Sequence, residues 1–253
     1  MAAYSIAKMD NGLFWLGQDA RGQGIVYRAN GYTGQRISTH AIEWQIQQYG
    51  NLSDAIGYTY QQDGHSFYVL IFPSANATWV YDVATQAWHE RAGFINGEFT
   101  RHRSNCQVFF NNKVLVGDYE NSNIYAFDLD DYSDNGSIQK WLRSWRALPT
   151  GQNNLKRTAQ HSLQLDLETG VGLVSGQGSD PQVMLRWSDD GGHTWSNEHW
   201  VSIGKIGEFY RRAIWRRLGM TMKIRDRVYE VSGTDPVKIA IMGAELLVSP
   251  TNA

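Results

Sequence analysis

Residues 188–195 combine two acids, two glycines, two hydroxyls and an indole in one short segment, SDDGGHTW. The segment follows the pattern Ser-x-Asp-x-Gly-x-Thr-Trp, formed by Ser188, Asp190, Gly192, Thr194 and Trp195. A carboxylate in a tight turn can accept backbone N–H bonds, and adjacent glycines can adopt the positive φ that such a turn needs. The spacing therefore predicts a stabilised hairpin turn with Trp195 packed beneath it.

This pattern is the Asp box, a signature found on hairpin turns of sialidase-type β-propellers. Sialidase chemistry would require an arginine cluster for the substrate carboxylate, a tyrosine nucleophile paired with a glutamate, and a further acid, commonly with several Asp boxes. This sequence has one Asp box, and it lies outside the repeated part of the chain described below. We therefore interpret the Asp box as structural and expect no enzymatic activity.

The acidic segment DLDDYSDNG, residues 128–136, could suit a hard cation such as calcium. Its spacing does not follow the Asp-x-Asp-x-Asp-Gly register, and no glutamate stands at the closing position. Histidines that could bind zinc show no spacing typical of helical zinc sites; they are His40, His65, His89, His102, His161, His193 and His199. We expect no metal ion and no cofactor.

Charge is distributed unevenly along the chain, although the formal net charge is only −2. Six acids and no base lie between residues 118 and 134, namely Asp118, Glu120, Asp128, Asp130, Asp131 and Asp134. Eight bases lie between residues 205 and 227, namely Lys223 and the seven candidate contact residues Lys205, Arg211, Arg212, Arg216, Arg217, Arg225 and Arg227. The two stretches carry opposite local charge.

The basic segment also contains Phe209, Tyr210 and Trp215, so it could meet a phosphate backbone or an acidic surface of another subunit or partner. It could equally form a solvated strand face whose cations are neutralised by nearby acids such as Glu208 and Glu230. The residues alone leave all of these interpretations open.

The 253 residues are 42% hydrophobic and 13% aromatic, which is enough for a packed core. No apolar run is long enough to span a membrane, and the first residues lack a basic segment followed by an apolar one, so we expect neither membrane insertion nor a targeting signal. The single cysteine, Cys106, excludes an intrachain disulfide, and we expect its thiol to be buried.

Short β-branched and aromatic runs between Gly, Asn, Asp and Pro predict an all-β fold. These runs are residues 67–72, 78–83, 113–118, 124–130, 163–168, 227–233 and 237–243. One segment, THAIEWQIQQYG, predicts a helix, because Ile42, Ile46 and Tyr49 fall on one face. Ser38 or Thr39 can cap its start, and Gly50 can close its end.

A loose repeat of two strands and two polar turns occurs three times in the first part of the chain, at residues 11–34, 63–88 and 111–136. A period near fifty residues is typical of the four-stranded blades of a β-propeller. Propellers normally need four or more blades, so we predict propeller-like blades that form an incomplete propeller, with missing blades expected upstream of Met1 on a longer natural chain.

The repeat stops in a polar stretch at residues 144–160, where we place a domain boundary. We assign residues 1–150 to the propeller-like blades and residues 151–253 to a smaller antiparallel β unit that carries the Asp-box hairpin. In this unit Leu163, Leu165 and Leu167 are expected to point inward. The segment RRAIWRR, residues 211–217, is expected to form a strand with arginines at both ends.

Several long segments together resemble the packaged-DNA stabilisation proteins of short-tailed phages, which form the tail nozzle. The most specific are RWSDDGGHTWSNEHW and RDRVYEVSGTDPVKIAIMGAEL, and the resemblance covers nearly the whole chain. Similar family members are considerably longer at the amino end, in line with the incomplete set of blades.

The resemblance implies a non-enzymatic protein of the virion tail, present in the host cytoplasm before assembly. It implies a homohexameric ring that docks below the portal-bound adaptor ring, extends the DNA channel, helps to retain packaged double-stranded DNA and receives the tail needle that plugs it. A conduit wall should not hold phosphates, so the acidic stretch would suit the channel and the arginines would suit subunit contacts.

A competing interpretation is a carbohydrate-binding or receptor-recognition β module, supported by ten tryptophans and the Asp box. Exposed pairs of aromatic side chains would favour it. A sialidase-like enzyme is a third and weaker alternative.

Overall fold

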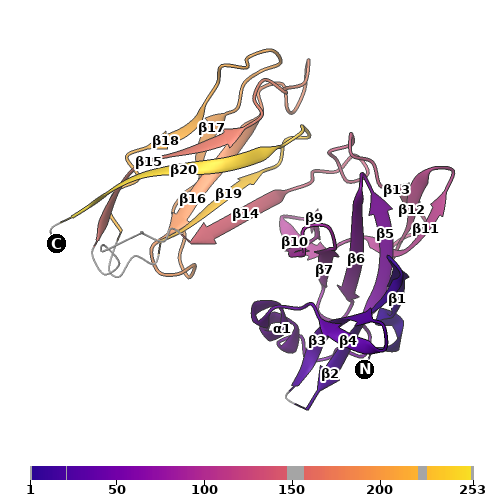
Figure 1. The fold of residues 1–253 in the computed structure, drawn as a ribbon. Helices are drawn as coiled ribbons and strands as arrows, with labels where there is room; N and C mark the ends of the chain where they lie inside the picture. The colour runs from indigo at the N-terminus through magenta and orange to yellow at the C-terminus, as the bar shows by residue number, and fades with distance from the viewer. Residues whose placement is uncertain (1, 21, 147–156, 222–226, 252–253) are drawn as a thin grey trace. The chain divides into compact units, whose positions relative to one another are not determined.

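Strands separated by tight turns form almost all of the regular structure of this chain (Figure 1). The computed structural model describes residues 2–20, 22–146, 157–221 and 227–251. Its contacts divide the chain into two units, Met1–Leu129 and Asp130–Ala253. Each unit is built around its own hydrophobic clusters.

Two four-stranded antiparallel sheets, in which each strand pairs with the next along the chain, open the first unit. Blade 1, preceded by the short 3₁₀ helix η1 (Ala3–Ser5), consists of β1 (Ala7–Met9), β2 (Gly12–Asp19), β3 (Gly22–Asn30) and β4 (Thr33–Arg36). Blade 2 consists of β5 (Ile56–Gln62), β6 (His65–Phe72), β7 (Ala77–Asp82) and β8 (Ala87–Glu90).

Two smaller sheets complete this unit. They are a hairpin of β9 (Ala92–Ile95) and β10 (Glu98–Arg101), and blade 3, which consists of β11 (Ser104–Phe110), β12 (Lys113–Asp118) and β13 (Ile124–Ala126). The three predicted repeats fall on blades 1, 2 and 3, so the predicted propeller-like architecture is confirmed. The described residues contain fewer than the four complete blades that a closed propeller normally needs.

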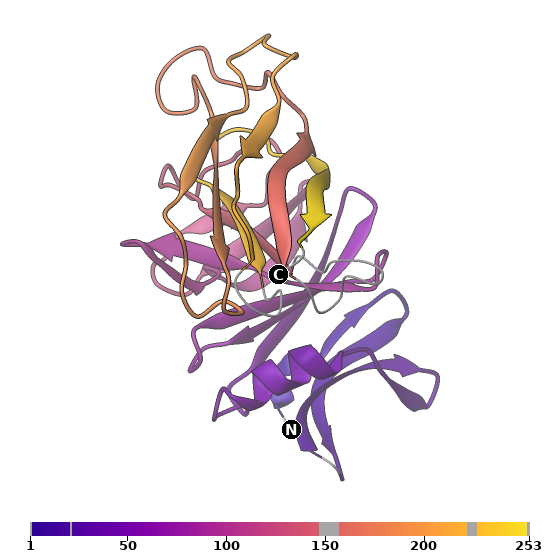
Figure 2. The same ribbon diagram turned by 90° about the vertical axis from the view of Figure 1, so that its left-hand side faces the viewer.

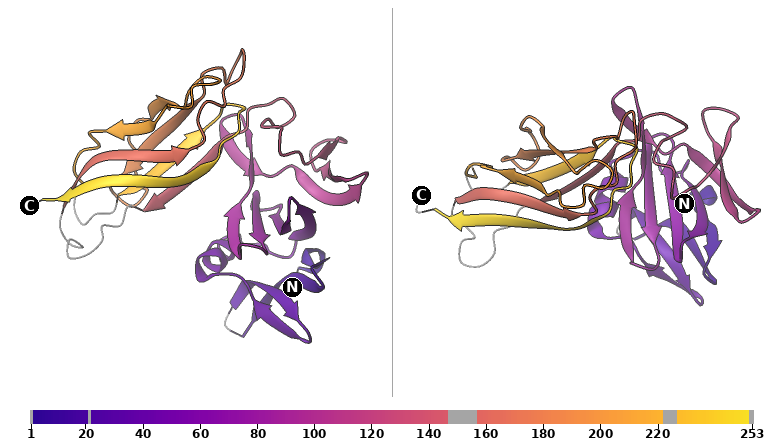
Figure 3. Two further views of the ribbon diagram at one scale, coloured as in Figure 1. Left: turned by 45° about the horizontal axis from the view of Figure 1, so that its top comes forward. Right: turned by 90° about the horizontal axis from the view of Figure 1, so that it is seen from above.

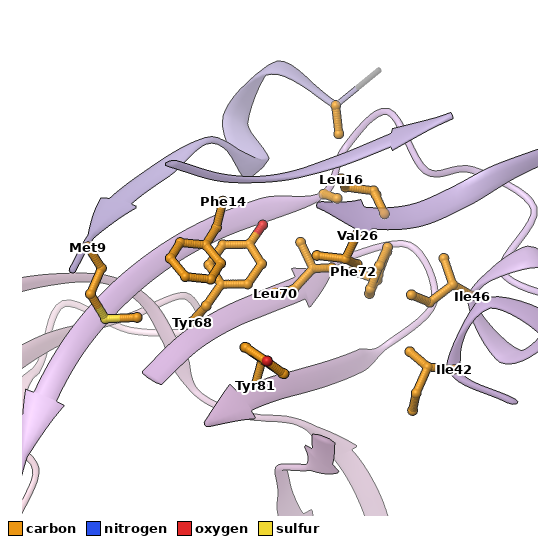
Figure 4. Close-up of a cluster of buried hydrophobic side chains, with 12 residues drawn as sticks. Met9, Phe14, Leu16, Val26, Ile42, Ile46, Tyr68, Leu70, Phe72 and Tyr81 are labelled. Atoms are coloured by element: carbon orange, nitrogen blue, oxygen red, sulfur yellow. The ribbon is translucent and has the colours of Figure 1, made fainter. Parts of the chain in front are cut away.

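Blade 2 is buried on both faces, which explains the continuous apolar run in β6. Tyr68, Leu70 and Phe72 join a cluster with blade 1, in which Phe14 stacks on Tyr68 at 5.3 Å between ring centroids (Figure 4). Val69 and Ile71 point the other way and join a cluster with Val114 and Val116 of blade 3. Successive side chains of a strand face opposite sides, so a blade between two others needs apolar residues at every position.

The predicted helix is present as α1 (His40–Gln47), which packs against β3 (Figure 2). Thr39 is the N-cap, and its hydroxyl accepts a hydrogen bond from the backbone N–H of Ile42 at 3.4 Å. Ile42 and Ile46 enter the cluster between blades 1 and 2, and Tyr49 packs against it. Gly50 has a φ of +67°, as a residue that turns the chain after a helix often does.

The second unit is a sandwich of two antiparallel sheets. The four-stranded sheet has the order β14-β19-β16-β17 and the three-stranded sheet the order β18-β15-β20. Their strands are β14 (Trp141–Arg146), β15 (Thr158–Leu167), β16 (Gln182–Ser188), β17 (His199–Ser202), β18 (Ala213–Arg216), β19 (Val228–Gly233) and β20 (Ile241–Pro250). Figure 3 shows β15 and β20 side by side over most of their length.

The core of the sandwich lies between its two sheets. As predicted, Leu163, Leu165 and Leu167 of β15 are buried, and they share a cluster with Leu185 of β16 and Val231 of β19. Intervening residues of β15 are partly or fully exposed, because the other face of this sheet meets solvent. The unit is therefore antiparallel, as the sequence predicts.

The two units divide at residue 129, earlier than the boundary that the sequence places at residue 150. The reason is β14, whose six residues pair with β19 from Trp141↔Gly233 to Arg146↔Val228. Pairing partners that far apart in sequence cannot be read from a local pattern. Residues 130–146 therefore lie with the sandwich rather than with the blades.

Cys106 is exposed, so the expectation of a buried thiol is wrong. The register of blade 3 explains the difference. Cys106 pairs with Gly117 and Val108 pairs with Leu115, on the face opposite Val114 and Val116. A glycine partner leaves the thiol uncovered on this face, where Val108 and Phe110 are also 56% and 67% exposed.

Candidate functional site

The basic segment surrounds β18, an edge strand of the three-stranded sandwich sheet. Five of the seven predicted contact residues have exposed side chains: Lys205, Arg211, Arg212, Arg216 and Arg217. Phe209 and Tyr210, just before the strand, are also exposed, at 74% and 78%. In contrast, Ala213 and Trp215 of β18 itself are buried in the sandwich core. The arginines at both ends of this strand thus remain at the surface, and Arg225 lies outside the described residues.

Glu208 neutralises one of these arginines. Its carboxylate accepts a hydrogen bond from Arg211 Nε at 3.0 Å and another from the backbone N–H of Lys205 at 3.2 Å. The bond from Arg211 lowers the pKa of Glu208. Local neutralisation, one of the alternatives considered for this segment, therefore applies to Arg211.

Arg216 and Arg217 lie beside His161 around a shallow pocket of about 460 Å³. Arg217 has a φ of +60°, and its backbone N–H donates to the His161 carbonyl at 2.7 Å. Within the described part of the chain, Arg212, Arg216 and Arg217 have no ion-pair partner. These three cations are available to a phosphate or a carboxylate of another molecule.

Arg227 is buried, which excludes the predicted surface role for this residue. Only 2% of it is exposed. Its Nε and Nη2 donate to the two carboxylate oxygens of Asp189 at 2.6 and 2.7 Å, and its remaining donors reach the carbonyls of Leu218 and Met220. Arg227 directly precedes β19 and Asp189 directly follows β16, and the pairing of Val228 with Ser188 brings the two side chains together. Arg227 therefore joins two loops of the sandwich.

The six acids of the acidic stretch do not all lie free at the surface. The Asp118 side chain is fully buried and pairs with Arg103 at 3.4 Å, which excludes it as a channel-wall residue in this structure. Glu120 is exposed but also contacts Arg103, at 2.9 Å. Asp131 accepts bonds from the N–H and hydroxyl of Ser133, which lower its pKa.

The unit boundary also falls within the acidic stretch. Asp118, Glu120 and Asp128 belong to the first unit, whereas Asp130, Asp131 and Asp134 belong to the second. Asp134 takes part in a small antiparallel bridge with Ser137. The channel or interface role of the exposed members stays a prediction.

The Asp-box turn follows β16. Asp190 Oδ1 accepts the backbone N–H groups of His193 and Thr194, each at 2.9 Å, and Oδ2 accepts the Thr194 hydroxyl at 2.7 Å. The Ser188 hydroxyl donates to Asp190 and accepts from Gly192 N–H. These bonds, led by that from Ser188, hold the pKa of Asp190 well below its usual range. Gly191 and Gly192 have φ values of +78° and +104°, as the turn requires.

The first unit contains a serine and a histidine in hydrogen-bond contact, an arrangement that occurs in nucleophilic enzymes. Ser104 Oγ lies 2.7 Å from His102 Nδ1 and 2.5 Å from the Tyr58 hydroxyl. However, Ser104 is only 1% exposed. Burial, with the nearby cations Arg91 and Arg103, lowers the pKa of His102 to about 3. A weak base beside an enclosed hydroxyl stabilises the fold and offers no nucleophile to a substrate.

Arg186 and Glu230, which no sequence motif marks as part of a site, meet on the four-stranded sandwich sheet. Arg186 of β16 is the register partner of Glu230 of β19 and donates to its carboxylate through Nε. The Arg186 guanidinium also stacks on the Trp195 ring, with Cζ at 4.6 Å from the centroid. No local sequence signal connects residues that only the strand register brings together.

Among the described residues, no group of three or more His, Cys, Asp or Glu side chains is arranged to hold a metal ion. In the same part of the chain, no helix has the length and apolarity needed to cross a membrane.

Comparison with known families gives matches over both units. Residues 1–132 match the family described as "Bacteriophage P22 Gp10, beta-propeller", and residues 140–249 match "Bacteriophage P22 Gp10, beta-sandwich". A comparison with curated proteins gives no match. The family assignments agree with the blades and the sandwich seen in the structure.

Two solved structures with weak similarity to this chain are glycoside hydrolases. An exo-beta-1,3-galactanase from Phanerochaete chrysosporium is 11% identical, with a TM-score of 0.22, over 96% of this chain and 56% of that chain. A family 43 arabinoxylan arabinofuranohydrolase from Bacillus subtilis is 9% identical, with a TM-score of 0.20, over 96% of this chain and 52% of that one. The chain thus spans about half the length of these proteins.

Proposed function

Because this chain belongs to the bacteriophage P22 Gp10 family of phage structural proteins, we propose that it is a subunit of the tail nozzle, which continues the DNA channel below the portal. In this role it forms a homohexameric ring, contacts the portal-bound adaptor ring and the tail needle, and helps to retain packaged double-stranded DNA until ejection. It acts in the virion tail, after assembly in the host cytoplasm, and it is not an enzyme.

One observation carries this proposal: two successive family matches cover residues 1–132 and 140–249, in the order propeller then sandwich. The same order of folds is present in the structure. A match of both parts, rather than of one widespread β fold, supports a role of the whole chain in the phage particle.

Two exposed surfaces support a role as a subunit, because each could be covered by a neighbouring protein in an assembly. The uncovered face of blade 3 presents Val108, Phe110 and Ile124, which are 56%, 67% and 72% exposed. The end of β18 presents Arg216 and Arg217, which have no ion-pair partner in the part of the chain that the structure describes. Apolar and arginine-rich surfaces of this kind are typical of protein interfaces.

The arginines around β18 bind carboxylates of a neighbouring subunit or of the adaptor in this proposal. A planar guanidinium can bind a carboxylate through two parallel hydrogen bonds. A strong grip on phosphates would slow the passage of DNA through a conduit. The contact with DNA is therefore transient and does not depend on these residues.

The test compares Arg216→Gln/Arg217→Gln with the exposed pair Lys8→Gln/Lys238→Gln, which removes the same charge at residues that belong to neither of these two surfaces. Sedimentation velocity and electron microscopy should show rings for the natural chain and the lysine variant, and loss of rings or of adaptor binding for the arginine variant. Melting curves should show that both variants stay folded. Normal assembly of the arginine variant would contradict the interface.

DNA binding provides the second arm of the test. Binding of duplex DNA weakens as salt rises, and the slope of log affinity against log salt concentration is about −0.9 for each phosphate contact. If these arginines bind phosphates, the arginine variant should make this slope less steep by about 0.9 for each contact that is lost. We expect the slope to stay unchanged. An absence of rings with the natural chain and its adaptor would overturn the nozzle role itself.

A further inference from the structure

The solvent face of the four-stranded sandwich sheet carries a second set of functional groups. Val183 and Leu185 of β16 point into the core. The alternate residues Gln182, Met184 and Arg186 therefore face away from it. The strand register places Trp200 of β17 opposite Met184 and Glu230 of β19 opposite Arg186.

Two indoles lie on this face. Trp200 is 59% exposed, whereas its cross-strand neighbour Met184 is only 5% exposed. The Trp200 ring thus has an apolar side chain beside it on the sheet and a large open surface toward solvent. Trp195 reaches the same face from the Asp-box turn and stacks on the Arg186 guanidinium at 4.6 Å. The turn thereby serves to position an aromatic ring as well as to close a hairpin.

The polar groups beside Trp195 on this face, Arg186 and Glu230, form a pair with no net charge. Glu230 is 6% exposed and accepts a hydrogen bond from Arg186 Nε. Within the described residues, the two terminal nitrogens of Arg186 and the second carboxylate oxygen of Glu230 make no hydrogen bond, and the two side chains are 33% and 8% exposed. The side-chain amide of Gln182, farther along β16, also has no partner there.

We propose that this face, formed by Gln182, Arg186, Trp195, Trp200 and Glu230, binds a neutral polysaccharide. A sugar ring has an apolar face of C–H groups that can lie on an indole, and a rim of hydroxyls that are both donors and acceptors. The face offers both kinds of partner: two indoles, and free donor and acceptor atoms beside them.

Charge decides between a neutral and an anionic polymer. Glu230 cancels the charge of Arg186, so an anion approaching this face gains little attraction and meets a carboxylate. Among the described residues, the cations Arg212, Arg216 and Arg217, which have no ion-pair partner there, lie elsewhere, around β18. Two aromatic rings on one open sheet face also suit an extended chain of sugars more than a single residue, because each ring can hold a different sugar. The proposal does not depend on ring assembly or on the nozzle role.

The experiment uses the full chain in native gels that contain dextran, mannan, galactan or a neutral bacterial O-polysaccharide. Retardation by at least one polymer is expected. Trp200→Ala should weaken binding about tenfold or more, because it removes a stacking surface. Trp195→Ala should act in the same direction. The control Trp44→Ala removes another exposed indole, on α1 in the first unit, and should leave binding unchanged.

A second variant tests the polar pair without removing a ring. Glu230→Gln keeps the size of the side chain but leaves Arg186 with an uncompensated charge. It should weaken binding of the neutral polymer and increase retardation by dextran sulfate relative to the natural chain. Melting curves show whether each variant stays folded. If Glu230→Gln does not fold, the binding of Trp195→Ala and Trp200→Ala tests the proposal.

Three results would overturn the proposal. These are no retardation by any of the four neutral polymers, equal retardation of Trp200→Ala and the natural chain, or binding of dextran sulfate alone that only the β18 arginine variant abolishes. A Trp200→Ala variant that binds polysaccharide normally but fails to form rings would assign this face to a protein partner instead.

Discussion

Strands β6 and β15 show how differently the two units use a strand. Five consecutive residues of β6, from Tyr68 to Phe72, are fully buried, because blade 2 lies between two other blades. In β15, Leu163 and Leu165 are buried while Gln164 and Asp166 face outward. A blade that lies between two others must satisfy both faces internally, whereas a sandwich sheet leaves one face to solvent and to partners.

The same difference determines whether charged side chains are buried and paired or exposed to solvent. In the first unit Glu43 is 4% exposed, and burial would raise its pKa, but hydrogen bonds from Arg36 and Ser38 outweigh this effect and lower it. His102 and Asp118 are likewise held by neighbours within the unit. In the sandwich, Arg227 is internal while Arg216 and Arg217 are at the surface. A charged side chain thus stabilises the fold where packed layers cover it on both sides. On a face that meets solvent, it can bind another molecule.

The largest expected effect on stability is at Arg227, which is buried, whereas the other described arginines of the basic segment are exposed. Arg227→Met should destabilise the sandwich by about 3–5 kcal/mol, because it leaves Asp189 and two carbonyls without their buried partner. Arg212→Met, at an exposed position, should change the free energy of unfolding by less than about 0.5 kcal/mol. Urea unfolding followed by hydrogen exchange of peptides from residues 157–251 measures both. Equal effects would remove the distinction between the two arginines.

The buried His102 should make the stability of the first unit depend on pH. The pKa of His102 is lowered from 6.5 to about 3, chiefly by burial. Between these values the unfolded chain binds a proton that the folded chain does not, so stability from this group is complete above pH 6.5 and is lost as the pH falls.

His102→Asn, which cannot titrate, should therefore show a smaller loss of stability between pH 6.5 and about pH 4 than the natural chain. Hydrogen exchange of peptides from residues 1–129 at several pH values provides the measurement. The exposed His193→Asn serves as the control and should leave the dependence unchanged. Identical pH profiles for the natural chain and His102→Asn would show that His102 is accessible to protons in the folded state.

A smaller effect is expected at the exposed Asp-box turn. Asp190→Ala removes the acceptor of two backbone N–H groups and of the Thr194 hydroxyl, and the melting temperature should fall by several degrees. Asp190→Asn keeps one acceptor oxygen and should cost less. Glu198→Ala, at a nearby exposed position, is the control. If Asp190→Ala keeps its melting temperature, the turn is held by its glycines and its packing alone.

The smallest effect on stability is expected on the uncovered face of blade 3. Cys106→Ser should leave the free energy of unfolding within about 0.5 kcal/mol, because the thiol is exposed. In the natural chain, a thiol reagent should label Cys106 completely without denaturant. Protection of the thiol in the assembled ring, but not in the single chain, would identify this face as a subunit contact. Slow labelling of the single chain would contradict the exposed position.

The sequence predicts the elements well where the signal is local. The helix at α1 follows from its apolar spacing and the Thr39 cap, and the blades follow from a repeated pattern of strands and turns. The turn bonds of Asp190 likewise involve residues within four positions of it. Such features depend on backbone geometry and on near neighbours, which a short segment contains in full.

Only the tertiary structure decides which side chains pair when they are far apart in the sequence. Arg186 and Glu230 lie 44 positions apart, and Arg227 and Asp189 lie 38 apart. The exposure of Cys106 depends on Gly117 across the strand and on the absence of a covering sheet on that face within the described residues. Composition and spacing determine that this chain forms blades and a sandwich with arginines near one strand. Register and layer packing determine which of those arginines are internal, because burial and partner choice belong to the folded sheet and not to any segment of it.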